Sequence, residues 1–281
     1  MSSPLISPEA LVQHLSDPAW VIVDTRHDLA DPGLGRRLHR EARIPGARYL
    51  SIDDDLSAAP TGRNGRHPLP SVEAFAATLG RAGIGNGHTV VVYDQGSAMF
   101  VGRLWWMLRW VGHTAVWVLD GGFAAWQAVG LPTEAGEPIV PTPVSFTPSE
   151  QPALRVTAEE LALRLAEPSL RVVDARAPER YRGDVEPLDA VAGHIPGAIN
   201  RPFAMNLRNG RFKPAEELAA EWQAVLAGRD PEKLVHYCGS GVSALANMLA
   251  MEHAGLTGSR LYAGSWSEWS SDPARPVAKG A

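Results

Sequence analysis

The sequence predicts an α/β fold that is repeated along the chain, and three observations support this prediction. The chain has 281 residues, which is about the length of two average domains. Short, continuously apolar strand segments alternate with amphipathic helical segments, a pattern typical of parallel sheets covered by helices on both faces. Four motifs of the first half also recur in the same order in the second half. We therefore expect two tandem α/β domains, each a mostly parallel central sheet flanked by helices.

The first repeated motif is a helix followed by a strand. The segment ISPEALVQHLSDPAWVIVDTR (6–26) aligns with VTAEELALRLAEPSLRVVDAR (156–176). Each copy begins with a helix-capping residue, Ser7 or Thr157, and each ends in Asp-x-Arg after an apolar strand. Because the Asp-x-Arg pair occurs in both halves, we interpret it as a support for the strand end and not as catalytic.

The other three motifs continue the repeat. They are RIPGARYL (43–50) with HIPGAINR (194–201), TVVVYDQGSA (89–98) with KLVHYCGSGVSA (233–244), and VWVLDGGFAAW (116–126) with SRLYAGSWSEW (259–269). Residues 132–154, between the halves, contain six prolines, which predict an extended linker. We therefore expect an N-terminal domain at 1–133, a linker at 134–153 and a C-terminal domain at 154–281.

The composition narrows the classes of function. Apolar residues make up 45% of the chain and charged residues 20%, as in ordinary globular proteins. The net charge of -5 gives no reason to expect binding to nucleic acid or to an anionic membrane. The single cysteine excludes an intramolecular disulfide and argues against a cysteine-rich zinc site. The apolar runs are too short to span a bilayer and the start lacks a signal-peptide pattern, so we expect a cytoplasmic protein without a metal or other cofactor.

That cysteine, Cys238, lies between the predicted strand LVHY and a predicted helix at 242–255. Ligands of parallel sheets bind at the carboxyl ends of strands, and a helix N-terminus offers unpaired N–H groups. Nearby glycines let the backbone curve around the sulfur. We therefore predict a thiolate at Cys238. The amides expected to hold it belong to Gly239, Ser240, Gly241, Val242, Ser243 and Ala244.

Two other interpretations of Cys238 remain open from the residues alone. A buried, inert thiol is the commonest fate of a single cysteine. A cysteine phosphatase would place an arginine six residues after the cysteine to bind phosphate oxygens. Here that position is Ala244, and no Lys or Arg occurs from 234 to 259. This absence argues against phosphatase activity.

The tandem layout, both IPGA segments, the CGSGVSA loop and GSWSEW together resemble the two-domain rhodanese-type sulfurtransferases, from about residue 6 to 277. The loop is similar to that of 3-mercaptopyruvate sulfurtransferases, whereas thiosulfate sulfurtransferases typically have basic residues directly after the cysteine. The resemblance implies two rhodanese-like domains. It also implies that Cys238 takes a sulfur from 3-mercaptopyruvate as a persulfide, releasing pyruvate. A thiol acceptor, such as thioredoxin or a small thiol, or cyanide then removes the sulfur. Thiosulfate as the donor, and a persulfide carrier that does not turn over small donors, are the alternatives.

The resemblance also implies a donor-binding site made of arginine. Arg180 matches the arginine that binds the donor, and mercaptopyruvate enzymes commonly have a second arginine nine residues later. This chain has Asp189 there, and Arg182 is the candidate replacement. From the residues alone, both arginines could equally belong to a solvated loop.

A proton relay is the last feature that the resemblance implies. Ser240, His67 and Asp53 match its serine, histidine and aspartate, and such a chain can move protons near neutral pH. The last two lie in the first half, so we expect the site between the domains. The plainer interpretation of His67 is a surface-loop histidine. The first half has Asp94 at the position of Cys238; a carboxylate cannot form a persulfide, so we expect that half to be inactive.

Overall fold

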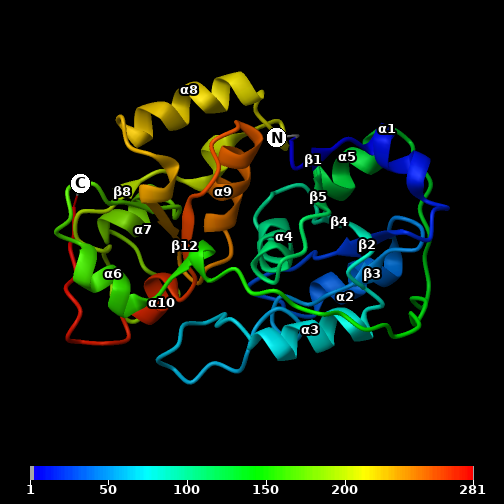
Figure 1. Cartoon of the computed structure of the whole chain (residues 1–281), viewed down its shortest axis with the longest axis horizontal. Helices are drawn as coiled ribbons and strands as arrows, with labels where there is room; N and C mark the ends of the chain where they lie inside the picture. The colour runs from blue at the N-terminus through cyan, green and yellow to red at the C-terminus, as the bar shows by residue number, and fades with distance from the viewer. Residues whose placement is uncertain (1–2, 281) are drawn as a thin grey trace.

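The computed structural model describes residues 3–280 and contains two five-stranded sheets (Figure 1). The first sheet joins, in spatial order, β1 (Leu5–Ile6), β5 (Val116–Leu119), β4 (Thr89–Tyr93), β2 (Trp20–Asp24) and β3 (Arg48–Tyr49). The second joins β6 (Arg155–Val156), β12 (Arg260–Tyr262), β11 (Leu234–Tyr237), β7 (Arg171–Asp174) and β8 (Ile199–Asn200). Every neighbouring pair in both sheets is parallel. The predicted α/β fold with two tandem parallel sheets is confirmed.

Helices connect the strands in both halves. The first half contains α1 (Pro8–Leu11), α2 (Leu34–Glu41), α3 (Val72–Arg81), α4 (Val101–Trp110) and α5 (Gly122–Ala128). The second half contains α6 (Ala158–Arg164), α7 (Pro178–Arg182), α8 (Ala215–Leu226), α9 (Ala244–His253) and α10 (Ser265–Trp269). A short antiparallel hairpin, β9 (Leu207–Arg208) with β10 (Arg211–Phe212), precedes α8. Ser7 and Thr157 cap α1 and α6 as expected, and Thr157 forms a full capping box with Glu160.

The central strand of the second sheet is β11, which lies between β7 and β12. All four of its residues are buried, because the sheet covers its edges and helices cover its faces. This explains why the sequence reads there as one apolar run and not as an alternating pattern. The carboxyl end of β11 therefore opens at the middle of the sheet edge, where a bound molecule is most enclosed.

The two halves meet where α4 packs against α9, and the two helices lie side by side at the centre of the molecule (Figure 1). A Cβ atom added at Gly102 would lie 2.7 Å from the Leu245 Cβ, so the helices approach as closely as a glycine allows. Buried side chains of both helices belong to one continuous hydrophobic cluster. At the rim of this contact Arg109 and Glu252 form an ion pair of 3.2 Å. The halves thus share a core.

The proline-rich linker is extended and lies on the first half. Residues 138–151 contain no helix or strand. The Val144 amide donates to the Gly80 carbonyl at 3.0 Å, the Ser149 amide donates to the Val111 carbonyl at 2.9 Å, and the Phe146 side chain is buried. We keep the predicted domain boundaries at 133 and 154 as a proposal.

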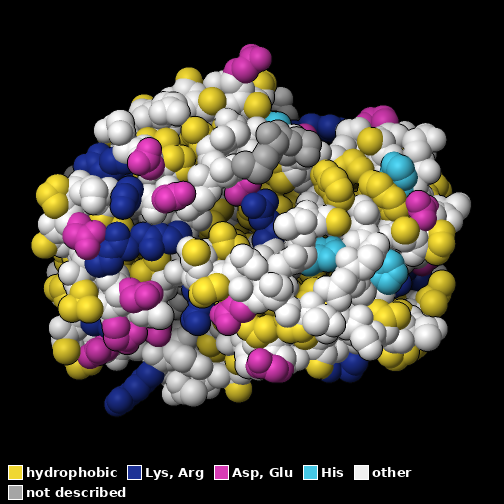
Figure 2. All heavy atoms as spheres, in the orientation of Figure 1, with side chains coloured by type: hydrophobic (Ala, Val, Ile, Leu, Met, Phe, Trp, Pro, Cys, Tyr) yellow, Lys and Arg dark blue, Asp and Glu magenta, His cyan; other side chains and the backbone are white. Residues whose placement is uncertain are grey.

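The described surface carries both signs of charge. Figure 2 shows Lys and Arg side chains interspersed with Asp and Glu side chains on the face in view, with hydrophobic side chains scattered between them. Within residues 3–280, no helix is both long and apolar enough to cross a membrane.

Candidate active site

Cys238 follows β11 directly, and the loop 238–243 then leads into α9, as the sequence predicts. The loop is fixed to the neighbouring segment after β12. The Ser265 hydroxyl accepts a hydrogen bond from the Cys238 amide at 3.1 Å, and the Cys238 carbonyl accepts one from the Trp266 amide at 3.0 Å. Gly241 has a φ of +73°, and a Cβ atom there would lie 2.1 Å from the Ala263 carbonyl oxygen. Only glycine therefore fits at 241.

The loop lowers the pKa of the Cys238 thiol. Burial by itself raises this pKa, because it disfavours the charged form. Hydrogen bonds to the sulfur from the Ser243 hydroxyl and from the amides of Ser240, Ala244 and Val242 outweigh the burial and hold the pKa below its usual value. The side chain is nevertheless only 2% exposed. The arrangement favours a shielded thiolate without a cation in its own loop.

Residues of both halves line the cavity at Cys238, which has a volume of about 190 Å³. Gly239, Ser240, Val242 and Ser243 form the floor beside the sulfur. The first half supplies Leu29, Arg66, Met99 and Phe100, and the second half adds Arg176, Ala177, Arg180, Leu188 and Phe203. A larger hollow of about 420 Å³ near Arg164 and Arg260 has no thiol or hydroxyl side chain among its lining residues. The chemistry therefore belongs to the smaller cavity.

The structure brings together the three residues of the expected proton relay. The His67 Nδ1 lies 2.7 Å from the Ser240 hydroxyl, and its Nε2 lies 3.1 Å from an Asp53 carboxylate oxygen. An ionised carboxylate can only accept, so Nε2 donates to Asp53 and Nδ1 accepts the hydrogen bond of Ser240. Burial, and next the nearby Arg103, lower the pKa of His67 to about 4. The imidazole is therefore neutral at pH 7 and can accept a proton through Ser240.

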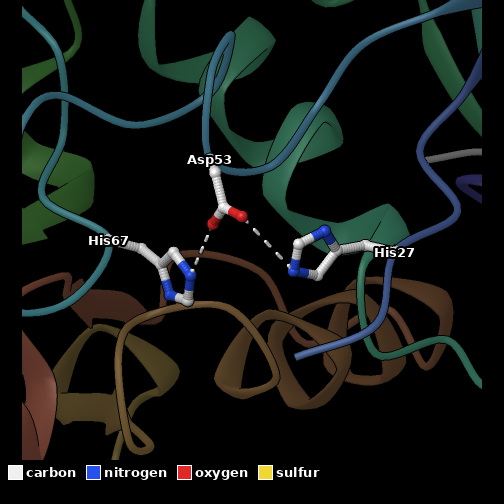
Figure 3. A group of neighbouring side chains, drawn as sticks. All are labelled: His27, Asp53 and His67. Atoms are coloured by element: carbon white, nitrogen blue, oxygen red, sulfur yellow. Dashed lines mark hydrogen bonds and ion pairs between the residues drawn. The ribbon is translucent and has the colours of Figure 1, made fainter. Parts of the chain in front are cut away.

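A second histidine, His27, lies on the other side of Asp53 (Figure 3). Its Nε2 is 3.8 Å from the second Asp53 oxygen, and its side chain is only 1% exposed. His27, Asp53 and His67 each bring a possible metal ligand within 4.8 Å of the others. Hydrogen bonds of the relay already account for the positions of His67 and Asp53, whereas His27 lies beside Asp53 at a distance too long for a hydrogen bond.

The predicted donor-binding arginine, Arg180, lies at this cavity on the short helix α7. Its Nη2 forms an ion pair with Glu186 at 2.6 Å and lies 3.4 Å from an Asp189 carboxylate oxygen. Glu186 also pairs with Arg176 at 3.1 Å, so this carboxylate orients two arginines at once.

The expectation that Arg182 replaces the missing second arginine is wrong. Its side chain is 42% exposed and pairs with Asp184 at 2.8 Å. It does not line the Cys238 cavity. Arg182 is two residues after Arg180, and two positions on a helix point to different sides. Arg180 therefore faces the site while Arg182 faces solvent.

Two further arginines approach the site from the first half, and the sequence analysis missed both. Arg66, next to His67, lines the cavity. Arg103, on α4, is fully buried and donates to the carbonyls of Leu56, His67 and Gly241. The sequence did contain a signal for Arg103, because this arginine is the only charged residue among the first ten positions of the apolar run MFVGRLWWMLRW (99–110). Arg66 had no such signal, because a loop arginine is ordinarily solvated.

The equivalent loop of the first half is built differently. Asp94 follows β4, is buried, and accepts hydrogen bonds from the amides of Gly96 at 2.7 Å and Phe100 at 3.3 Å. Its carboxylate thus occupies the place of a bound anion.

The Asp-x-Arg pairs behave alike in both halves: Arg26 binds Asp24 at 2.6 Å, and Arg176 binds Asp174 at 2.7 Å.

Comparison with known proteins decides the family. The model of the rhodanese-like domain matches this chain twice, at residues 7–129 and 157–272. The chain belongs to the rhodanese family. A solved rhodanese structure, SseA from Escherichia coli, described as a 3-mercaptopyruvate sulfotransferase, superimposes with a TM-score of 0.83 at 30% identity. The match covers 94% of this chain and 99% of that one.

Curated rhodanese relatives fall under two substrate names. A protein of Pseudomonas aeruginosa named probable 3-mercaptopyruvate sulfurtransferase is 45% identical over 282 residues, which is 99% of each chain. A protein of Mycobacterium tuberculosis named putative thiosulfate sulfurtransferase SseB is 40% identical, over 92% of this chain and 90% of its own.

Proposed function

We propose that this protein is a sulfurtransferase that moves the sulfur of 3-mercaptopyruvate, as the sulfane sulfur of a persulfide on Cys238, to a thiol acceptor or cyanide. One observation carries the proposal. A thiol with a lowered pKa lines a small cavity together with Arg180 and Ser240, and the Ser240 hydroxyl is hydrogen-bonded to His67 behind the lining. The names of the relatives in Pseudomonas aeruginosa and Escherichia coli point to the same donor.

The first half-reaction transfers one sulfur atom. The Cys238 thiolate attacks the donor's thiol sulfur, so a sulfur–sulfur bond forms while the bond between that sulfur and carbon 3 breaks. The electron pair of the broken bond remains on carbon 3, giving the enolate of pyruvate. The proton of the donor's thiol is transferred to this carbon, and pyruvate leaves. Ser240, His67 and Asp53 are placed to carry the proton, because they form one hydrogen-bonded chain beside the sulfur.

The amide loop then holds the persulfide. Its negative charge lies on the outer sulfur, and the amides of Ser240, Val242 and Ala244 can bind that charge without a guanidinium. In the second half-reaction, an acceptor thiolate attacks the outer sulfur and Cys238 leaves as a thiolate. We propose thioredoxin or a small thiol as this acceptor, with cyanide as the assay substitute. A reduced Cys238 and a thiol acceptor fit a reducing compartment such as the cytoplasm.

We propose that the first half does not catalyse the transfer. Asp94 has no nucleophilic sulfur and already fills its own loop. The first half supplies one wall of the cavity and the histidine and aspartate of the relay. The active thiol belongs to the second half alone.

Mass spectrometry tests the proposal directly. Protein mixed with 3-mercaptopyruvate should gain one sulfur, about 32 Da, located on Cys238 by peptide mapping. Cys238→Ser should gain nothing, while Ser243→Ala should still gain sulfur, more slowly. If this protein takes up no sulfur from either mercaptopyruvate or thiosulfate, the proposed sulfur transfer is wrong.

Thiosulfate is the second candidate donor, and the name of the relative in Mycobacterium tuberculosis favours it. Thiosulfate would leave as sulfite after the same attack on its outer sulfur. Steady-state rates with each donor separate the two, with Arg180→Ala as the variant that weakens donor binding. Loading of Cys238 without turnover of either donor would identify a persulfide carrier instead.

A further inference from the structure

Two guanidinium groups, one from each half, converge on the same point above Gly239. A Cβ atom placed on Gly239 would lie 2.7 Å from Arg66 Nη2 and 3.5 Å from both Arg180 Nη1 and Nη2. Gly239 directly follows Cys238, and both arginines line the Cys238 cavity. The point where they converge is therefore within reach of a small donor whose sulfur lies at the thiolate.

The loop that carries Arg66 is fixed to the opposite half. The Arg66 amide donates to the Ser267 hydroxyl on α10 at 3.1 Å. Gly65 lies so close to α10 that a Cβ atom there would be 2.9 Å from the Gly264 carbonyl oxygen. The light-blue loop in Figure 1 reaches across to α10 in this way. Arg66 is thus held over the catalytic loop by contacts that do not involve its guanidinium.

Acidic residues orient both guanidiniums and, within residues 3–280, leave a terminal nitrogen of each without a partner. Arg66 Nη1 binds Asp189, whereas Arg180 uses Nε and Nη2 for Glu186 and Nη2 for Asp189. Within residues 3–280, no hydrogen-bond acceptor contacts Arg66 Nη2 or Arg180 Nη1. Arg66 Nη2 is the atom nearest the Cβ position of Gly239, and Arg180 Nη1 lies as near to that position as Arg180 Nη2 does. Two free N–H donors that meet at one point match the two oxygens of a carboxylate.

We propose that Arg66 is the second arginine that binds the carboxylate of the donor, supplied from the first half and acting together with Arg180. This inference rests on the proposed sulfur transfer. Asp189, which occupies the position of the absent arginine, holds Arg66 in place through its side chain. The site thereby selects a small donor that has a planar carboxylate near its sulfur. Glycine at 239 leaves the Arg66 guanidinium in this position, because a Cβ atom there would displace it.

Kinetics with 3-mercaptopyruvate test the role of Arg66. Arg66→Gln should raise the apparent KM roughly 10- to 100-fold, the loss expected for one charge-assisted hydrogen bond, with kcat changed by less than about threefold. Arg63→Gln, an exposed arginine of the same loop, is the matched control and should leave KM unchanged. In the Arg66→Gln background, Asp189→Arg should restore KM to within about fivefold, because it returns a cation to the same place. An unchanged KM for Arg66→Gln would overturn the proposal.

Alkylation of Cys238 provides a test that does not depend on sulfur transfer. Iodoacetate carries a carboxylate and iodoacetamide is neutral, so the ratio of their rates measures the cation beside the thiolate. Arg66→Gln should lower this ratio about tenfold or more, whereas Arg63→Gln should not. Equal slowing by both reagents would show that Arg66 acts on the thiolate and not on the carboxylate, which would also overturn the proposal. If the protein takes up no sulfur but keeps its preference for iodoacetate, the proposed function fails and the Arg66 site stands.

Discussion

The Arg103 guanidinium, on α4 of the first half, donates a hydrogen bond of 3.1 Å to the carbonyl of Gly241 in the thiol loop of the second half. The same side chain donates to the carbonyls of Leu56 at 3.0 Å and His67 at 2.9 Å. One buried group therefore connects the α4 helix, the relay loop and the catalytic loop. Burial lowers its pKa to about 10, and the nearby Cys238 thiolate opposes this, so Arg103 remains charged at neutral pH.

Arg103→Met should destabilise the protein strongly. The substitution leaves several buried carbonyls without a donor, and the free energy of unfolding should fall by about 3 kcal/mol or more. Arg109→Met, on the same helix, removes a partly exposed ion pair and a cation–π contact with Trp105, and should cost about 1 kcal/mol. Urea denaturation measures the free energy of unfolding of both variants. Equal losses would mean that Arg103 does not connect the three segments.

Gly102→Val should weaken the packing between the two halves and lower the Tm of the protein. The new side chain would meet Leu245 on α9, where even a Cβ atom comes within 2.7 Å. Overpacking of this kind costs about 1–3 kcal/mol. The same substitution at Gly87, which has no atom within 4 Å of its Cβ position, is the control. Differential scanning calorimetry should show a lower Tm for the first variant than for the second.

The relay should behave as a unit. Ser240→Ala and His67→Gln should each lower kcat for mercaptopyruvate by about 100-fold, because either change breaks the path of the proton. The double variant should be little slower than either single variant, because one substitution already interrupts proton transfer and the second removes no further function. Two independent losses that multiply would contradict a shared relay.

Stability should fall as the pH drops below about 6.5, and His236 is one cause. This histidine is fully buried against Trp222, neither ring nitrogen has a hydrogen-bond partner in the described part of the chain, and burial lowers its pKa to about 3. Between these pH values the unfolded chain binds a proton that the folded chain does not, so the folded state loses about 1.4 kcal/mol per pH unit from this group. His236→Leu should flatten the slope of unfolding free energy against pH by that amount. An unchanged slope in urea titrations from pH 6 to 4 would assign the acid sensitivity to other groups.

The sequence predicted what local pattern determines. Continuous apolar runs such as LVHY gave the parallel strands, and the repeat placed Cys238 at the end of one of them. Arg180 is found at the cavity because it lies on a short helix close to that strand end. The meeting of His67 and Asp53 with Ser240, across the two halves, was implied by the family resemblance and not by local pattern.

What the sequence did not reveal depends on contacts between the halves. Arg182 was chosen for its nearness to Arg180 along the chain, but helical geometry turns it away. Arg66 reaches the cavity only because its loop lies on α10, a contact between residues about two hundred positions apart. Neither pattern nor charge in one half predicts where the loop of the other half will lie.

The loop that carries Arg66 also has a consequence for engineered chimeras. The thiol and its amides belong to one half, while a cation above them comes from the other. A hybrid that joins this second half to the first half of a related protein would keep its nucleophile and receive a different entrance for the donor. Substrate preference could then be changed by exchanging halves, with the reacting loop left untouched.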